Sequence, residues 1–273
     1  LRCGPADRRP EMSSRSTGRD GPPVRVTGGA VSRPGQRLPG WREVLAVVAH
    51  PDDETFGLGA VADSLTTGGA AVHVLCFTHG EASTLNENHA ALHEARQQEL
   101  RQAAAELGIA TVTLLDYPDG HLAEVPPGEM SGQVARLAVR SGAEGLLVFD
   151  DTGITGHPDH QAATRAAMSA ALAASLPVLA WTLPDAVAGR LRAETGAAFT
   201  GQPPGRVDLC VRVGRARQRR AALMHASQIS PGAVLWRRLQ LQGDCEHLRW
   251  LHRPGGASPV QAGAAPEVPA GRG

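Results

Sequence analysis

Short apolar runs recur along the chain, and most are followed by a longer segment in which apolar residues return every three or four positions. The length and the β-branched residues of the runs are typical of strands buried on both faces. They lie at 44–49, 71–77, 111–115, 146–149 and 177–183. Helical spacing follows at 55–67, 90–107, 127–140 and 157–173. This alternation predicts an α/β fold, a Rossmann-like open and mostly parallel sheet with helices on both faces.

The last third of the chain has a less regular pattern. Residues 207–213 alternate between apolar and polar, which predicts a half-exposed strand, and residues 215–225 predict an Arg-rich helix. We expect a short helix within 232–251. Residues 184–205 contain several prolines and glycines and show no clear period, so we expect an irregular, mobile cover over a functional site.

Composition predicts one folded domain between two loose ends. Residues 40–253 carry the strand and helix patterns, whereas 1–39 and 254–273 are rich in Gly and Pro and have few large apolar residues. We therefore expect a loosely attached arm at 1–39, a single domain at 40–253 and a flexible tail at 254–273. The first residue is Leu1 and Met12 follows closely, which suggests that translation starts after Leu1.

Charge and composition argue against several functional classes. The sequence has 27 Lys or Arg residues and 27 Asp or Glu residues, so its formal net charge is zero and we expect no nucleic-acid partner. All of the basic residues are arginine. The absence of lysine excludes a P-loop lysine for nucleotide phosphates and a Schiff-base lysine for pyridoxal phosphate.

The cysteines and the apolar runs bear on the compartment. Cys3, Cys76, Cys210 and Cys245 form no C-x-x-C pair, so we expect neither a zinc ribbon nor a disulfide framework. No apolar run approaches the length of a membrane span, and the first forty residues lack the apolar core of a secretion signal. We therefore expect no transmembrane segment and a cytoplasmic location.

Two polar clusters stand directly after buried apolar runs. The first, His50-Pro51-Asp52-Asp53-Glu54, places one imidazole and three acids within five residues. Adjacent carboxylates repel unless a cation lies between them, and a neighbouring imidazole can bind that cation. The alternative is that Asp52 or Asp53 only caps the following helix. The second cluster, His157-Pro158-Asp159-His160, carries two histidines on one face of a predicted helix, which favours a metal site.

The two clusters together resemble the paired signatures of the LmbE-like/PIG-L family of zinc-dependent N-deacetylases. The resemblance rests on HPDDE at 50–54 and GHPDH at 156–160, with shorter matches at 78–81, 96–100 and 119–120. It implies the LmbE-like form of the predicted sheet. In such a sheet the carboxyl ends of the strands gather the functional loops, so the two clusters should meet.

The resemblance implies a catalytic zinc ion held by three side chains. They are His50, Asp53 and His160. Spacing alone leaves open whether Asp52 or Asp53 is the ligand. The resemblance makes Asp52 the general base, which later protonates the leaving amine, and makes His157 the group that stabilises charge on the carbonyl oxygen. Asp159 and Glu54 are expected to support the site rather than to bind the metal.

The resemblance also implies three substrate contacts, two of which have a simpler alternative. Arg96 is predicted to contact the substrate, although a charge on a helix is commonly only solvated. Asp119 is predicted to hold sugar hydroxyls, although an Asp before Gly is commonly only part of a turn. His225 is predicted to lie near the site because His225 to Gln228 resembles a family stretch.

The reaction implied by the resemblance is removal of acetyl from an N-acetylglucosaminyl group of a small glycosylated substrate. Overall likeness favours the branch that acts on glycopeptide-antibiotic intermediates of the teicoplanin type. One alternative is a mycothiol-type deacetylase or thiol-conjugate amidase, but the mycothiol member has a tyrosine where this chain has Thr155. The other is a sugar-binding protein that has lost catalysis. The intact Asp52 and His157 argue against it, because sugar binding requires neither.

Overall fold

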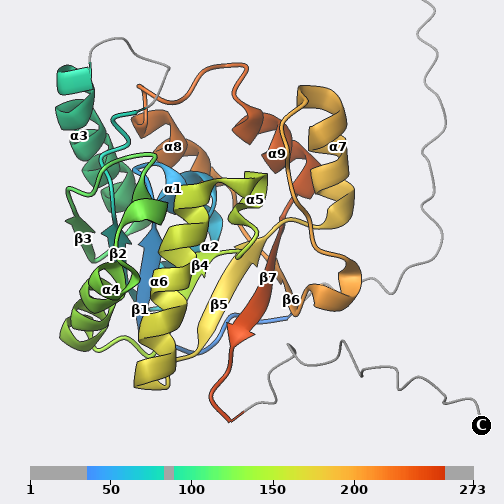
Figure 1. Cartoon of the computed structure of the whole chain (residues 1–273). Helices are drawn as coiled ribbons and strands as arrows, with labels where there is room; N and C mark the ends of the chain where they lie inside the picture. Colours follow the sequence, from blue (N-terminus) through green and yellow to red (C-terminus); the bar gives the residue numbers. More distant parts are fainter. Residues whose placement is uncertain (1–35, 83–88, 256–273) are drawn as a thin grey trace, which may run out of the picture.

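The computed structural model describes residues 36–82 and 89–255 and places a twisted sheet at the centre (Figure 1). Within these ranges the sheet has seven strands. They are β1 (Glu43–Val48), β2 (Ala71–Cys76), β3 (Thr111–Leu114), β4 (Gly145–Phe149), β5 (Val178–Thr182), β6 (Leu209–Arg212) and β7 (Cys245–His252). The α-helices are α1 (Asp53–Phe56), α2 (Gly59–Thr67), α3 (His89–Leu107), α4 (Pro127–Ser141), α5 (Gly153–Gly156), α6 (Pro158–Ala174), α7 (Asp185–Thr195), α8 (Ala216–Met224) and α9 (Val234–Gln242). Almost all of the predicted arm and tail lies outside the described residues, so the domain boundaries stay predictions.

The strand order confirms the predicted fold class. It is β3-β2-β1-β4-β5-β7-β6, and the first five strands of this order pair in parallel. Only β7 runs antiparallel to its neighbours β5 and β6 among the described strands. The order reverses between β1 and β4, which is where an open α/β sheet forms its ligand crevice.

Helices cover both faces of the sheet, which explains the uninterrupted apolar run of β1. Val44, Ala46 and Val48 pack into the core on the face covered by α2 and α7. Leu45 and Val47 pack on the opposite face, against α4 and α6, which Figure 1 shows in front of the sheet. Every residue of β1 after the first is therefore buried.

For the last third of the chain, one prediction is wrong and another is confirmed but incomplete. Residues 184–205 are not irregular throughout, because α7 forms there; only Ala188 and Leu191 of this helix are buried, a stripe too narrow to produce a clear period. The expected short helix within 232–251 is present as α9, but β7 follows it. Charged side chains such as Glu246 and Arg249 interrupt the apolar positions of β7, so its pattern does not indicate a strand.

The expectation of no disulfide is also wrong. Cys210 on β6 and Cys245 on β7 are bonded, and their Cα atoms lie 6.1 Å apart. The antiparallel register of these two strands brings together residues that are 35 positions apart in sequence, and cysteine spacing carries no information on that register. Among the described residues, Cys76 is the free cysteine. The cytoplasmic location stays a prediction.

In residues 36–82 and 89–255, no helix combines the length and the apolar character that crossing a bilayer requires.

Candidate metal centre and active site

The turn after β1 is organised by the carboxylate of Asp53. Its Oδ2 atom accepts hydrogen bonds from the backbone N–H groups of Ala49, at 3.2 Å, and His50, at 2.9 Å. Its Oδ1 atom faces the His160 imidazole. The capping alternative is not what the turn shows: Asp52 is the N-cap residue of α1, but its side chain makes no capping hydrogen bond.

The second cluster begins α6 at the end of β4. His157 is the N-cap residue, and its Nδ1 atom accepts a hydrogen bond of 3.2 Å from the backbone N–H of Asp159. One residue further, the ring of His160 turns back over α5, and its Nδ1 atom lies 3.2 Å from the carbonyl oxygen of Gly153. This contact fixes Nδ1–H as the donor, so the lone pair of His160 Nε2 is left for another partner.

The structure brings the two clusters together, as the sequence predicts. The Nε2 atom of His160 lies 3.2 Å from Asp53 Oδ1, and the Nδ1 atom of His50 lies 3.5 Å from Asp53 Oδ2. Ligand atoms that share a tetrahedral zinc ion lie roughly 3.3 Å apart, given metal–ligand bonds of about 2.0–2.1 Å. His50, Asp53 and His160 therefore fit a single small divalent ion, and all three are largely buried.

A second group of potential ligands, His50, His157 and Asp159, overlaps the first. It fits a metal less well because its donors are already used. Both oxygens of Asp159 accept backbone hydrogen bonds, from Gly120 at 2.7 Å and from Leu122 at 3.1 Å. The Nδ1 atom of His157 accepts from the helix backbone. The geometry thus agrees with the expectation that Asp159 supports the site.

Two carboxylates hold the far side of the His50 ring. Its Nε2 atom lies 3.0 Å from Asp119 Oδ1 and 3.4 Å from Asp159 Oδ2. A ring that donates Nε2–H to a carboxylate presents Nδ1 to a metal, which is the common arrangement of metal-binding histidines. Burial acts to lower the pKa of His50. The hydrogen bonds that the ring donates to Asp119, Asp159 and Asp53 outweigh burial and raise this pKa well above its ordinary value. The pocket is therefore electrostatically suited to a cation.

Asp52 occupies a strained backbone position beside the ligands. Its φ angle is 114°, a region that residues other than glycine rarely adopt, and such strain is concentrated at functional sites. Burial raises the pKa of Asp52 to about 6, against the opposing effect of the Arg96 charge. This value suits a group that gains and loses a proton near neutral pH.

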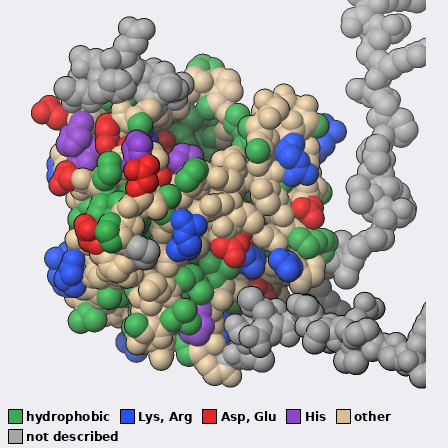
Figure 2. Space-filling view, viewed as in Figure 1, with side chains coloured by type: hydrophobic (Ala, Val, Ile, Leu, Met, Phe, Trp, Pro, Cys, Tyr) green, Lys and Arg blue, Asp and Glu red, His purple; other side chains and the backbone are tan. Residues whose placement is uncertain are grey.

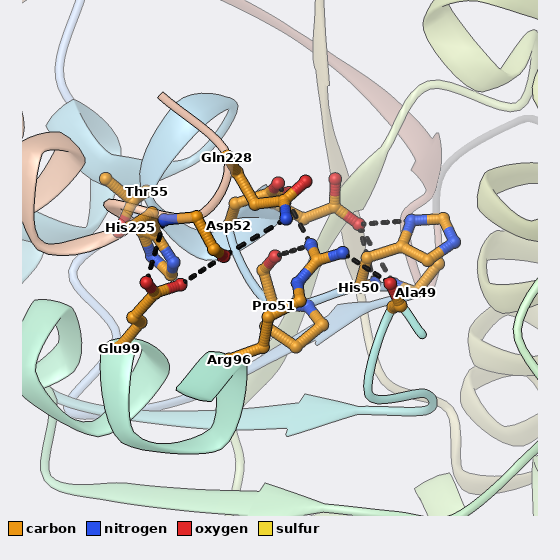
Figure 3. A network of polar contacts seen from close by, with 12 residues as sticks. Ala49, His50, Pro51, Asp52, Thr55, Arg96, Glu99, His225 and Gln228 are labelled. Atoms are coloured by element: carbon orange, nitrogen blue, oxygen red, sulfur yellow. Dashed lines mark hydrogen bonds and ion pairs between the residues drawn. The ribbon is translucent and has the colours of Figure 1, made fainter. Parts of the chain in front are cut away.

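Arg96 approaches Asp52 from α3. Figure 3 shows its guanidinium in the middle of the network, with His225 on one side and His50 on the other. Its Nη2 atom lies 3.1 Å from Asp52 Oδ2 and also donates to the Pro51 carbonyl oxygen. Its Nη1 atom donates to the Gly80 carbonyl oxygen at 2.7 Å. The Arg96 side chain is 4% exposed. As the molecule stands, Arg96 positions Asp52, and its direct contact with a substrate stays a prediction.

His225 lies behind Asp52 rather than in the open part of the site. Its imidazole is completely buried, and its Nε2 atom lies 2.8 Å from Glu54 Oε1. The other oxygen of Glu54 accepts the backbone N–H of Asp52 at 2.9 Å. The structure therefore links His225 to Asp52 through Glu54, and the predicted contact between His225 and substrate also stays a prediction.

Asp119 faces the metal-binding edge from the loop after β3. Besides His50 it bonds to the backbone N–H of Ala82 at 2.8 Å, so it joins the loops that follow β2 and β3. Burial acts to raise its pKa, but the His50 hydrogen bond outweighs burial and lowers it. Asp119 is thus an ionised partner of His50, a role that the sequence did not suggest.

Sequence reasoning also missed the role of Gly80. This residue has a φ of +67°, and a Cβ atom there would lie 2.1 Å from Arg96 Nη1. Gly80 therefore makes room for the guanidinium that holds Asp52. The signal was present in the sequence, since a glycine in the polar loop after a buried strand indicates a close approach or a left-handed backbone.

Comparison with known proteins relates this site to a family. A family model described as PIG-L, GlcNAc-PI de-N-acetylase, matches residues 45–171, which include both polar clusters. The probable N-acetylglucosaminyl-phosphatidylinositol de-N-acetylase of Schizosaccharomyces pombe is 33% identical over 143 residues, covering 50% of this chain and 55% of that protein.

Two bacterial relatives align over more of the chain. The probable N-acetyl-alpha-D-glucosaminyl L-malate deacetylase 2 of Bacillus anthracis is 28% identical over 226 residues, covering 78% of this chain and 92% of that protein. The 1D-myo-inositol 2-acetamido-2-deoxy-alpha-D-glucopyranoside deacetylase of Kineococcus radiotolerans is 28% identical over 219 residues, covering 62% of this chain and 61% of that protein. The chain therefore spans little more than half the length of the first and third of these relatives.

Solved structures share the fold. The N,N'-diacetylchitobiose deacetylase of Pyrococcus horikoshii superposes with a TM-score of 0.60 at 20% identity, covering 81% of this chain and 88% of that one. A deacetylase of the teicoplanin biosynthesis pathway, solved with teicoplanin, gives 0.59 at 17% identity, covering 76% and 96%. At these identities the likeness concerns the fold alone.

Proposed function

We propose that this chain, which matches the PIG-L model of de-N-acetylases over residues 45–171, hydrolyses the acetamide of an N-acetylglucosaminyl conjugate with the help of a bound divalent metal, zinc by expectation. The observation that supports this most is the meeting of His50, Asp53 and His160 at ligand spacing with a strained, buried carboxylate, Asp52, beside them. Sugar binding without catalysis requires no such arrangement.

The bound metal would supply Lewis acidity to the attacking water and to the amide carbonyl. The protein side chains supply the proton transfers and the orientation. Asp52 takes the proton of the attacking water, and the Arg96 ion pair keeps its carboxylate turned toward the site. Once protonated, the same carboxyl can return the proton to the amine nitrogen as the C–N bond breaks, which gives acetate and the free amine of the glucosaminyl conjugate.

His157 is suited to donate a hydrogen bond to the carbonyl oxygen. Because its Nδ1 atom accepts from the α6 backbone, the proton of the neutral ring is on Nε2. Burial lowers the pKa of His157, and the nearby His160 and His50 lower it further, so the ring is neutral at pH 7. A neutral donor at that place stabilises charge that develops on the oxygen.

The conjugate that carries the sugar is a separate part of the proposal. Our sequence-based choice is a glycopeptide-antibiotic intermediate of the teicoplanin type. The competing choice is an N-acetylglucosaminyl inositol, the compound after which the Kineococcus radiotolerans deacetylase is named. Thr155, in place of the tyrosine of the mycothiol member, favours the first choice.

Release of acetate tests the proposal. The metal-loaded protein is incubated with an N-acetylglucosaminyl glycopeptide, with 1-O-(2-acetamido-2-deoxyglucosyl)-inositol and with free N-acetylglucosamine, and acetate and free amine are measured. Acetate from the glycopeptide supports the whole proposal. If only the inositol glycoside releases acetate, it is the substrate in place of the glycopeptide. If none of the compounds releases acetate, the acetamide-hydrolase function is rejected.

A further inference from the structure

A cavity of about 190 Å³ adjoins the metal-binding edge. Two of the proposed ligands, Asp53 and His160, form one wall, and most of the remaining wall is hydrophobic. The apolar lining comes from α1, β4, α5, β5, the segment after α7, and α9. It consists of Phe56, Phe149, Ile154, Trp181, Phe199, Val234 and Leu235. A hydrophobic hollow that opens on a reaction centre is a place for a part of the substrate.

The sheet order separates this cavity from the polar part of the site. The loops after β2 and β3 bring Glu81 and Asp119, which suit sugar hydroxyls, to one side of β1. The cavity walls come chiefly from β4, β5 and the elements near them, on the other side of β1. An amide carbonyl at the metal edge has two substituents, so a sugar on the polar side directs the acyl group toward the cavity.

One charged side chain, Arg238, lines this otherwise apolar wall away from the ligands. It is 4% exposed and lies over the Trp181 ring, with its guanidinium carbon 4.8 Å from the ring centroid. Its Nη1 atom donates to Gln242 Oε1 at 2.8 Å, and its Nη2 atom donates to the carbonyl oxygen of Phe56. These two contacts satisfy two of the five N–H groups of the guanidinium.

Arg238 has no carboxylate at ion-pair distance among residues 36–82 and 89–255. The buried acid of this region, Glu246, pairs with Arg215 and also accepts from the Trp181 indole at 2.7 Å. Burial lowers the pKa of Arg238 to about 10, so it still carries its charge at neutral pH. Glu246, which bonds to Gln242, attracts the Arg238 charge but makes no direct pair with it. A buried cation without a direct carboxylate partner is unfavourable, and an anionic group in the cavity would relieve that cost.

We propose that the cavity receives the acyl group of the substrate and that Arg238 pairs with a carboxylate at the end of that group, as in an N-succinyl or N-glutaryl glucosaminyl conjugate. This inference rests on the proposed amide hydrolysis and extends its substrates from N-acetyl to N-acyl glucosaminyl conjugates whose acyl group ends in a carboxylate. A volume of about 190 Å³ holds roughly six groups of the size of a water molecule, at about 30 Å³ each, whereas the methyl of an acetyl group fills only one such share.

Equilibrium binding tests the inference without relying on turnover. Metal-loaded Asp52→Asn protein is titrated calorimetrically with N-succinylglucosamine and with N-(4-methylpentanoyl)glucosamine, which has the same shape but no charge. The proposal predicts that the succinyl compound binds about 10- to 100-fold more tightly, as expected for a charge-assisted hydrogen bond in a buried site. The preference should disappear in the additional variant Arg238→Gln and partly persist in Arg238→Lys.

Arg237→Gln is the matched control. Arg237 neighbours Arg238 on α9 but pairs with Glu194 outside the cavity, at 2.6 Å, so its loss should leave the preference unchanged. Should Arg238→Gln fail to fold, Val234→Trp provides a second route. It narrows the cavity at the first residue of α9, and it should weaken both acyl compounds relative to N-acetylglucosamine.

Three outcomes would overturn the inference: equal or tighter binding of the uncharged compound, a succinyl preference that persists in Arg238→Gln, and unchanged binding of both acyl compounds in Val234→Trp. The first would leave a purely hydrophobic pocket, and the second would leave Arg238 only a link between α9 and α1. Acetate release by the wild-type protein is measured separately. Failure there rejects the acetamide-hydrolase function, while the binding data still decide the role of Arg238.

Discussion

The Nη2 atom of Arg96 lies 3.1 Å from the Oδ2 atom of Asp52, and this ion pair connects α3 to the strained turn after β1 (Figure 3). The two residues are 44 positions apart in sequence. The pair holds the proposed base beside, rather than within, the group of metal-binding side chains. The residues that would hold a metal are therefore distinct from the residue that moves a proton, and replacing a member of either group should have a different effect.

Replacing the proposed base should remove turnover and leave the metal. We expect Asp52→Asn to retain one metal ion per chain, because none of the three ligands changes, and to lower kcat by about 10²- to 10⁴-fold, the usual contribution of a general base. Acetate release and metal content are measured on the same preparation. Asp63→Asn is the control, because Asp63 lies on α2 and pairs with Arg217 of α8. Full activity of Asp52→Asn would refute the assignment.

Gly80 offers a test of Arg96 that leaves Arg96 itself in place. In Gly80→Ala the new Cβ would lie 2.1 Å from Arg96 Nη1, so the guanidinium must move away from Asp52. Gly142→Ala is the matched control, because Gly142 has the same φ of +67° but no heavy atom within 4 Å of the added Cβ. Both should lose about 1–2 kcal/mol of stability from the left-handed backbone.

Only Gly80→Ala should also lose activity. Displacing one charge-assisted hydrogen bond costs about 1.5–3 kcal/mol, so we expect its activity to fall by tenfold or more. Urea denaturation and acetate release measured on both variants separate the two effects. Equal activity of the two variants would show that Asp52 does not depend on Arg96.

The buried pair of His225 and Glu54 should make stability depend on pH. Burial acts to lower the pKa of His225, but Glu54 outweighs it and the pKa is raised. A raised pKa in the folded state means that the pair contributes fully below the unfolded-state value of about 6.5, and that this contribution is lost as pH rises through the folded-state pKa.

We therefore expect His225→Gln to be destabilised most at low pH, where breaking a buried pair costs about 3–5 kcal/mol, and less at pH 9. The free energy of unfolding of the wild type and the variant is compared at pH 6, 7.5 and 9 in the same metal-loaded state. A difference that grows with pH would contradict the charged pair.

The disulfide between β6 and β7 should stabilise the last two strands of the chain. Reduction of Cys210–Cys245, or Cys210→Ser, is expected to lower the free energy of unfolding by about 2–4 kcal/mol, as is typical for a loop of this length. Urea curves with and without reductant measure the effect. Reductant should shift the wild type and leave Cys210→Ser unchanged; a wild type insensitive to reductant would indicate that the bond contributes nothing.

The parallel part of the sheet and its helices could be predicted from sequence because the central strands β1, β4 and β5 are buried on both faces, and burial leaves an apolar run. The edge could not. In β7, Glu246 is an acid buried against Arg215 and Trp181, so the pattern along this strand is set by ion pairing and not by an apolar face. In α7 only a narrow stripe is buried, which leaves little periodicity to read.

The candidate site divides in the same way. The meeting of His50 and His160 follows from two clusters at the carboxyl ends of β1 and β4, which the strand order makes neighbours. The partners of Arg96, Asp119 and His225 do not follow from any pattern, because they depend on which side chains meet across loops. Sequence likeness indicated that these residues belong near the site, and only the structure relates them to Asp52 and His50.

Metal stoichiometry tests the central claim most directly. Wild-type protein and His160→Ala are stripped of metal, reloaded with Zn²⁺ and dialysed, and zinc per chain is measured by mass spectrometry of the digested protein. We expect one zinc ion per wild-type chain and almost none in His160→Ala, because only two of the three proposed ligands, His50 and Asp53, then remain. Stoichiometric zinc in His160→Ala, or none in the wild type, would contradict this claim.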